Sequence, residues 1–153
     1  MNPPITKETI HLLREGLPIE KGPKGLTIRI EEYFHRREGV DDVDFILEAP
    51  DEELGIGKER IGEANSSIHH RQSCEDNFRI GAKSAVLWDI QVCPEWRRKG
   101  IGSECLRIMK EYAKLRGAER FYAADVQTEF RGFFVDAGFA PTDDSDWWIL
   151  REF

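Results

Sequence analysis

The sequence has few cysteines and no long apolar run. Its three cysteines, Cys74, Cys93 and Cys105, are an odd number without close pairing, which excludes a disulfide framework and favours reduced thiols. No uninterrupted apolar segment approaches the roughly 20 residues that cross a bilayer, so a membrane span is excluded. The first residues lack the charged and then apolar layout of a secretion signal. We therefore expect a cytoplasmic protein that has no membrane partner.

Positive charge is also scarce. The chain carries 22 lysine and arginine residues against 29 aspartate and glutamate residues, a net charge of -7. This excess repels polyanions, so it argues against a nucleic-acid partner and favours a cationic one. No Ser/Gly-rich linker divides the 153 residues, and we expect a single domain over residues 1–153. No histidine or cysteine spacing typical of zinc occurs, and no metal site is predicted.

The first half of the chain predicts one helix and three strands. Apolar residues between Thr6 and Leu17 follow helical spacing. Segments 25–34, 43–49 and 60–70 are rich in β-branched or aromatic residues and are separated by turn signals, which predicts antiparallel strands. The charges between Val40 and Glu53 are all acidic, which is more typical of a solvated loop surface than of a patch that recognises amines.

The second half predicts a strand, helix and strand unit. Segment 84–92 has apolar residues on both faces and reads as a central strand. Strict alternation puts Val86, Trp88, Ile90 and Val92 on one face and Leu87, Asp89 and Gln91 on the other. A helix then runs from Ile101 until Gly117 ends it, and segment 120–126 follows after a tight turn. Such a crossover makes the two strands parallel.

The end of the chain predicts a second helix and a hairpin. The helix has Thr128 as N-cap, ends at Gly138, and directs four residues inward: Phe130, Phe133, Phe134 and Ala137. Segments 139–142 and 147–153 predict an antiparallel pair. In the last strand the side chains of Trp147 and Trp148 point to opposite faces. We therefore expect one of them in the core and the other at the surface or at a subunit contact.

The run RRKGIG from Arg97 to Gly102 lies between the central strand and the long helix. Gly100 and Gly102 have no Cβ, so backbone amides at the helix start can close on an anion. Arg97, Arg98 and Lys99 add neutralising charge. The segment therefore predicts a binding site for a diphosphate.

With these features together, the chain resembles the GNAT superfamily of N-acetyltransferases. Arg97, Gly100 and Gly102 fill its Q/R-x-x-G-x-G/A motif, DIQVCPEW is similar to the strand before that loop, and DAGFAP looks like the closing Gly-Phe motif. The three pieces cover Ser84 to Phe153 in the family's order. The resemblance implies an α/β (α+β) fold: a mixed, mostly antiparallel central sheet with one splayed parallel strand pair and flanking helices.

The resemblance also implies acetyl-CoA as cofactor, bound between the two splayed strands. Backbone groups of Ile90 and Val92 would line the slot, and the amides from Arg98 to Ser103 would hold the pyrophosphate at the helix N-terminus. The cofactor-binding residues expected on this basis are Ile90, Val92, Arg97, Arg98, Lys99, Gly100, Ile101, Gly102, Ser103, Gln127 and Phe134.

The reaction implied by the resemblance is direct attack of an uncharged amine on the thioester. It requires a base for the ammonium proton and a proton for the leaving thiolate. Asp89, on the strand beside the slot, is the first candidate for the base, with Asp125 and Glu129 behind it. A purely structural carboxylate is an equally open interpretation of Asp89.

The chain departs from the family pattern at the proton donor. Phe134 stands where many members have a tyrosine that protonates the thiolate, and Gln127 replaces a nearby asparagine. A phenyl ring donates no proton, so Ser103, Tyr122 or a water must serve, or catalysis is weak. An ordinary thiol pKa of about 8.5 makes the thiolate a tolerable leaving group without help.

A second departure lies upstream. The segment HRREGVDD, between the first two predicted strands, is too short for the two helices that commonly wall the acceptor site. The acceptor groove is therefore expected to be open, suited to a protein terminus, a lysine or a bulky amine, unless a homodimer partner closes it.

Three functions follow from these observations. The first is an acetyl-CoA-dependent N-acetyltransferase that acts on a primary amine of a small molecule or protein. The second is a catalytically weak or inactive acyl-CoA sensor or interaction module, for which Phe134 is the distinguishing feature. The third is a protein that binds a different phosphorylated ligand at RRKGIG.

Overall fold

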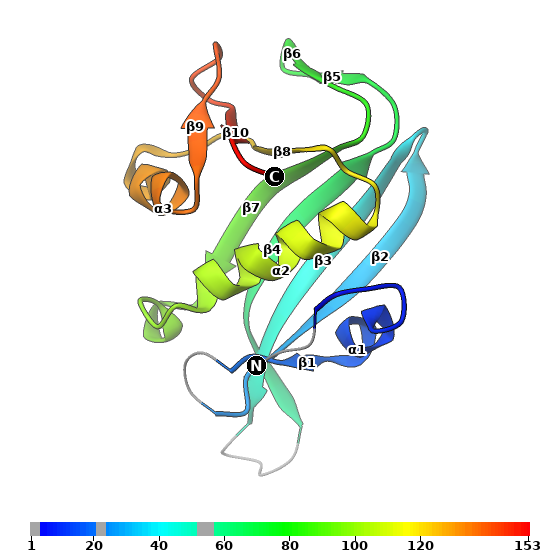
Figure 1. The fold of residues 1–153 in the computed structure, drawn as a ribbon. Helices are drawn as coiled ribbons and strands as arrows, with labels where there is room; N and C mark the ends of the chain where they lie inside the picture. The colour runs from blue at the N-terminus through cyan, green and yellow to red at the C-terminus, as the bar shows by residue number, and fades with distance from the viewer. Residues whose placement is uncertain (1–3, 21–23, 52–56) are drawn as a thin grey trace.

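The computed structural model describes residues 4–20, 24–51 and 57–153. Within these residues the strands form an eight-stranded sheet in the order β1-β2-β3-β4-β7-β8-β10-β9 and a separate β5-β6 hairpin (Figure 1). The helices are α1 (Ile10–Glu15), α2 (Ile101–Leu115) and α3 (Arg131–Asp136), with 3-10 turns η1 (Pro94–Trp96) and η2 (Thr128–Phe130). The strands are β1 (Leu17–Pro18), β2 (Thr27–Arg37), β3 (Val40–Pro50), β4 (Lys58–His69), β5 (Ser73–Glu75), β6 (Phe78–Ile80), β7 (Ser84–Val92), β8 (Arg120–Ala123), β9 (Phe139–Pro141) and β10 (Trp148–Leu150).

The sheet is mostly antiparallel, as the sequence predicts. Among the described strands, β7 and β8 are the one parallel pair, and α2 connects them. Figure 1 shows α2 crossing the face of β3, β4 and β7. The mixed α/β fold with a parallel pair and flanking helices is confirmed.

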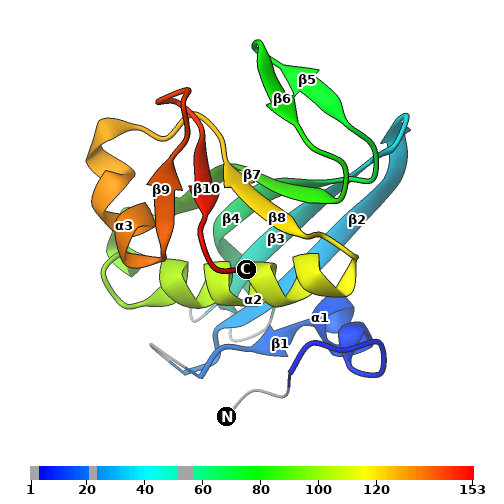
Figure 2. The same ribbon diagram turned by 45° about the horizontal axis from the view of Figure 1, so that its top comes forward.

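The two faces of the sheet are covered differently. A large core joins the sheet to α1, α2 and α3 on one face, through buried side chains such as Leu13, Met109 and Phe134. A smaller core forms on the opposite face of β7, β8 and β10, and the β5-β6 hairpin contributes Ile80 and Phe78 to it. This hairpin projects from the sheet well away from α1 (Figure 2).

The smaller core explains a wrong prediction about the final strand. Trp147 and Trp148 do alternate, but both are buried, one in each core. The ring of Phe78 stacks on Trp147 with centroids 4.4 Å apart. The hairpin, which sequence patterning did not predict, therefore covers Trp147, so neither tryptophan is left at the surface.

A β-bulge at Trp88 corrects the expected faces of β7. The register pairs Asn65 with Asp89 and Ser66 with Leu87, so Trp88 is the extra residue that the ladder skips. A one-residue insertion reverses the alternation beyond it. Val86 and Trp88 therefore pack in the smaller core, whereas Ile90 and Val92 pack against the large core: the prediction that these four share a face is wrong.

The connection between β2 and β3 is a tight turn at Glu38 and Gly39. No helix is inserted there, as the short segment predicts. The acidic stretch that begins at Val40 is not the predicted loop surface, because most of it forms strand β3. Asp42, Asp44 and Glu48 lie half-buried along this strand. The part of the stretch at residues 52–56 lies outside the described residues.

The helices match their predicted positions with shifted ends. α1 is shorter than expected because Leu17 already belongs to β1. Gly117 adopts a left-handed conformation, φ 88°, directly after α2, as a terminating glycine should. Thr128 is not an N-cap but the first residue of the 3-10 turn η2, and Phe130 is 48% exposed instead of inward. Over the described ranges, no helix combines the length and the apolar character needed to cross a membrane.

Candidate functional site

The candidate site begins where β7 and β8 separate. Their parallel register ends at the pair Leu87 and Ala123, although β7 continues to Val92. The amide of Ala124 donates to the carbonyl of Leu87 at 3.0 Å, and the chain then turns at Asp125, which has a φ of 50°. Past this point the two strands diverge. The divergence creates the slot between them that a splayed pair predicts.

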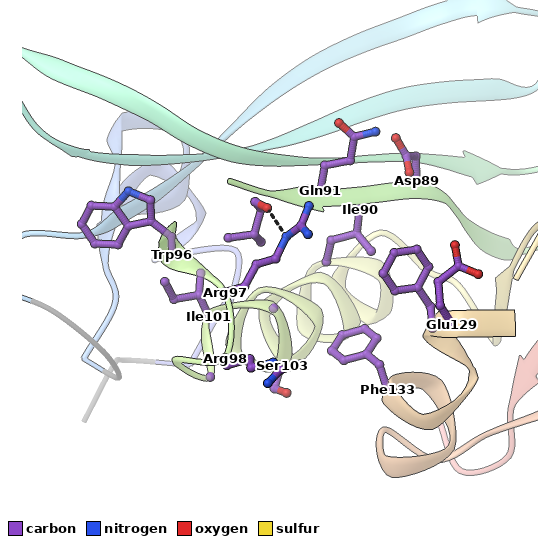
Figure 3. Close-up of a pocket in the computed structure, with 14 residues that line it drawn as sticks. Asp89, Ile90, Gln91, Trp96, Arg97, Arg98, Ile101, Ser103, Glu129 and Phe133 are labelled. Carbon is purple, nitrogen blue, oxygen red and sulfur yellow. Dashed lines mark hydrogen bonds between the residues drawn. The ribbon is translucent and has the colours of Figure 1, made fainter. Parts of the chain in front are cut away.

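A cavity of about 720 Å³ opens at this divergence (Figure 3). It runs from the end of β7 to the loop before α2 and is bordered by η2 and α3. A smaller cavity of about 70 Å³ lies deeper between the strands and shares Asp89, Ile90, Phe130 and Phe133 with the first.

The loop before α2 has the geometry of an anion cradle. Arg98 and Gly100 both adopt left-handed conformations, φ 60° and 80°, which turn the chain sharply into the helix. The first amides of a helix have no carbonyl partner within it, and none of the described side chains caps α2 at its N-terminus. These amides, at the positive end of a 15-residue helix, can bind a phosphate.

Ten of the predicted site residues line the larger cavity. They are Asp89, Ile90, Val92, Arg97, Arg98, Gly100, Ile101, Gly102, Ser103 and Glu129. Three more, Asp125, Gln127 and Phe134, line the smaller cavity. Lys99 lines neither cavity, because its ammonium group lies over the ring of Trp96, 5.5 Å from the centroid.

Sequence reasoning missed four residues that line the larger cavity: Gln91, Trp96, Phe130 and Phe133. Phe133 approaches the loop closely, since a Cβ added to Gly102 would lie 3.5 Å from its ring. The helical spacing of Phe130 and Phe133 pointed to the core, which hid their place at the cavity. Trp96, directly before the loop, is the residue from which an aromatic side of the cavity could have been predicted.

The candidate carboxylates gather at one end of the cavity. Figure 3 shows Asp89 and Glu129 at the end away from Trp96. The bulge at Trp88 brings Asp89 onto the sheet face opposite α2, level with Asn65. Within the described part of the chain, the Asp89 carboxylate has no hydrogen bond or ion pair. Asp89 is exposed, so its carboxylate is open to water or to a substrate at this end of the cavity.

The residues expected as proton donors lie in different parts of the structure. Tyr122 packs in the smaller core with its ring 5.4 Å from Phe78, and it lines neither cavity. Ser103 lines the larger cavity from the first turn of α2, on the loop side of the site. Phe134 is buried and packs edge-on against Phe139 at 5.4 Å. A water is therefore the remaining expected donor at the Asp89 end.

A row of polar side chains leads from the slot across the uncovered face of the sheet. The register aligns Asp89 with Asn65 on β4, Asp44 on β3 and Glu31 on β2. Asn65 donates to Asp44 at 2.9 Å, which shows that the two share this face. Glu31 is paired with Arg29 at 2.8 Å, whereas Asp44 has no cation partner among the described residues. The face beside Asp89 is thus net acidic.

The sequence matches a family model. The model of the acetyltransferase (GNAT) family matches residues 11–139. A search of curated protein sequences found no match.

Solved structures of similar fold include the following three. The PaiA N-acetyltransferase from Thermoplasma acidophilum in complex with coenzyme A is similar with a TM-score of 0.52 and 18% identity, covering 73% of this chain and 61% of that one. The KacTA-DNA complex is similar with a TM-score of 0.52 and 16% identity, covering 75% of this chain and 69% of that one. An acetyltransferase from Thermus thermophilus is similar with a TM-score of 0.50 and 21% identity, covering 71% of this chain and 62% of that one. The similarity thus spans about three fifths of the length of the PaiA chain.

Proposed function

The chain belongs to the acetyltransferase (GNAT) family, and from this we propose that it transfers an acetyl group from acetyl-CoA to a primary amine of a small molecule or protein. The opposite charge at the two ends of one cavity carries the proposal. Arg97 and Arg98 lie on the loop, where phosphates would bind. Asp89 and Glu129 lie at the other end, where a cationic amine would be attracted.

The residues present fit the phosphate end of the coenzyme. A Cβ built on Gly100 would meet no atom within 4 Å, so the loop is open on that side of the glycine. Arg97 and Arg98 supply positive charge beside them. The slot beyond, lined by Ile90 and Val92, is suited to the narrower pantetheine arm. When bound, the coenzyme supplies a thioester carbon that an uncharged amine can attack.

The carboxylate end supplies the proton acceptor. An ammonium group that reaches Asp89 loses a proton to its carboxylate, directly or through a water, and becomes a nucleophile. The amine nitrogen would then form the new N–C bond as the C–S bond breaks, and the second proton that this nitrogen loses would pass through a water to the departing sulfur. Asp125 and Glu129 line the same slot region and are the alternative bases.

The uncovered sheet face supports a cationic acceptor. In the row from Asp89 to Asp44, Asp89 is exposed, and Asn65 and Asp44 are half-buried. Neighbouring strands lie about 4.8 Å apart, so Asp44, two strands away, is about 10 Å from Asp89. An amine with a second positive charge at that distance would gain from Asp44. The net charge of -7 supports such an acceptor over a nucleic acid.

A catalytically weak acyl-CoA-binding module is the second candidate function. The observation that favours it is Phe134, which lines the smaller cavity and offers no proton. Such a protein would keep the phosphate loop and the slot but turn over slowly.

Two measurements test the proposal. A thermal-shift titration compares acetyl-CoA, free CoA, ATP and NAD, because a ligand that binds the folded state raises the melting temperature. We expect stabilisation by both CoA species, and stabilisation by ATP alone would contradict the proposal. A thiol-release assay then compares polyamines, peptides, aminoglycosides and amino acids, using Asp89→Asn and, as a matched control, Asp136→Asn, an exposed residue that lines neither cavity. Binding without release by any acceptor would favour the second function.

A further inference from the structure

The face that Asp89 occupies depends on the bulge at Trp88. Strict alternation from Leu87 would put Asp89 on the α2 face together with the large core. Because the ladder skips Trp88, Asp89 pairs with Asn65 on the uncovered face instead. A shift of one residue in this register would exchange the positions of Asp89 and Ile90. Whatever holds the bulge therefore also holds Asp89 at the slot.

A buried chain of hydrogen bonds holds the side chain of the bulged residue. The indole N–H of Trp88 donates to the hydroxyl of Ser67 at 2.8 Å. That hydroxyl lies 2.7 Å from Nε2 of His69, and Nδ1 of His69 lies 3.0 Å from the hydroxyl of Ser73. Ser67 and His69 have no exposed surface. We call the residues Ser73, His69, Ser67 and Trp88 the relay.

The donors and acceptors of the relay match in one direction. An indole N–H only donates, so the Ser67 oxygen accepts it. Among the described residues Nε2 of His69 is then the acceptor that satisfies the buried Ser67 hydrogen. His69 is then neutral with its hydrogen on Nδ1, which donates to Ser73. This tautomer is assigned from the chain of partners. A protonated His69 would carry hydrogens on both nitrogens and could no longer accept from Ser67.

The β5-β6 hairpin completes the support of the bulge. Ser73, the end of the relay, is the first residue of β5. Phe78 of β6 stacks on Trp147, and Trp147 meets the Trp88 ring edge-on with centroids 5.6 Å apart. The indole of Trp88 is thus fixed by hydrogen bonds at its nitrogen and by aromatic contact at its ring.

We propose that Ser67 and His69 are positioning residues for acetyl transfer, which hold the Trp88 bulge and thereby keep Asp89 at the slot. The inference rests on the proposed function for its catalytic consequence. Neither Ser67 nor His69 lines either cavity, so they act through Trp88 and not on the substrate. The hairpin, through Ser73, belongs to the same support.

The activity test compares two serines on one strand. Ser67→Ala removes the centre of the relay, whereas Ser66→Ala removes a buried hydroxyl whose hydrogen bond, 2.8 Å to the carbonyl of Val43, lies outside the relay. We expect Ser67→Ala to lower kcat about tenfold or more, because a displacement of roughly 1 Å can cost a hundredfold, with the CoA dissociation constant unchanged. Ser66→Ala should retain kcat. In addition, His69→Gln, whose amide can accept from Ser67, should retain more kcat than His69→Leu. Equal kcat in the two serine variants would overturn the proposal.

A second measurement does not depend on turnover. Hydrogen exchange of the Trp88 indole N–H is followed by NMR with ¹⁵N-labelled tryptophan, and Trp88→Phe assigns the signal. We expect a protected indole in the wild type and in Ser66→Ala, and fast exchange in Ser67→Ala. An indole in Ser67→Ala that stays protected would overturn the relay. If the wild type releases no thiol with any acceptor while Ser67→Ala exposes the indole, the proposed function fails and the relay stands as the support of the bulge.

Discussion

Arg97 donates from Nε to the carbonyl oxygen of Val92 at 2.8 Å. The bond joins the loop that we propose to bind phosphate to the strand that lines the slot, so the positions of the loop and the slot are fixed relative to each other. We predict that Arg97→Ala weakens CoA binding roughly tenfold, the effect of losing one hydrogen bond from a charged group. Arg97→Lys should recover only part of the affinity, because an ammonium group does not reproduce the planar guanidinium donor. Isothermal titration calorimetry measures both. A lysine variant that binds CoA as tightly as the wild type would show that charge alone matters.

Asp44 should affect the choice of acceptor. If the uncovered face binds a second positive charge, Asp44→Asn raises KM for a linear diamine several-fold and leaves KM for a monoamine of similar length unchanged, since exposed ion pairs contribute up to about 1 kcal/mol. Steady-state kinetics with a series of diamines of increasing length measures the effect. Glu119→Gln removes the same charge beside Lys83, far from the slot, and is the control. Equal changes for mono- and diamines would contradict a role for this face.

His69 should make stability depend on pH. Burial, together with the charges of Arg37 and His70, lowers the pKa of His69 from 6.5 to about 4. Between these values the unfolded chain binds a proton that the folded chain does not, so the free energy of unfolding decreases as the pH falls from 6.5 towards 4.

The size of this loss is of the order of 3 kcal/mol, because the two pKa values differ by about 2.5 and each pKa unit corresponds to about 1.4 kcal/mol. Urea unfolding at several pH values compares the wild type with His69→Gln, which has no titrating group at this position. We expect a shallower decrease in the variant over this range. Parallel curves would show that His69 is protonated equally easily in the folded and unfolded chain.

Phe134→Tyr restores a hydroxyl at the smaller cavity. Because Phe134 lines that cavity, the added hydroxyl can reach the slot and donate a proton to the leaving sulfur. We predict that kcat increases by up to about tenfold, a modest gain because the thiol has an ordinary pKa of about 8.5. Phe139→Tyr adds the same atom to a neighbouring ring that lines neither cavity, and should not raise kcat. An unchanged kcat in Phe134→Tyr would show that proton donation does not limit the rate.

The order and type of the main elements could be predicted from the sequence. Segment 84–92 and the helix after Gly100 carry strong periodicity and clear end signals, and they form β7 and α2 as expected. Segment 120–126 forms β8 over Arg120–Ala123 only, because the chain turns away from β7 at Asp125. The loop that we propose as the phosphate site could be located from the sequence because its glycines and arginines are adjacent in the chain. The short segment between β2 and β3 correctly excluded helices there.

The remaining features depend on contacts between distant residues. Nothing local to Trp88 marks it as a bulge, because the extra residue is defined only by the pairing of β7 with β4. The β5-β6 hairpin has strands of three residues each, too short for a periodic signal, and its role in burying Trp147 is visible only in the folded chain. The row from Asp89 to Glu31 likewise joins four strands whose register no single segment determines.

The most direct test of the account measures CoA affinity at Gly102. A Cβ at this position would make an ordinary contact with the ring of Phe133 at 3.5 Å, so Gly102→Ala should fold and bind CoA almost as well as the wild type. Gly102→Glu adds a carboxylate at the helix N-terminus, where the pyrophosphate must bind, and should reduce affinity beyond detection by isothermal titration calorimetry while its circular dichroism spectrum stays native. Undiminished CoA binding by a folded Gly102→Glu variant would contradict the assignment of the site.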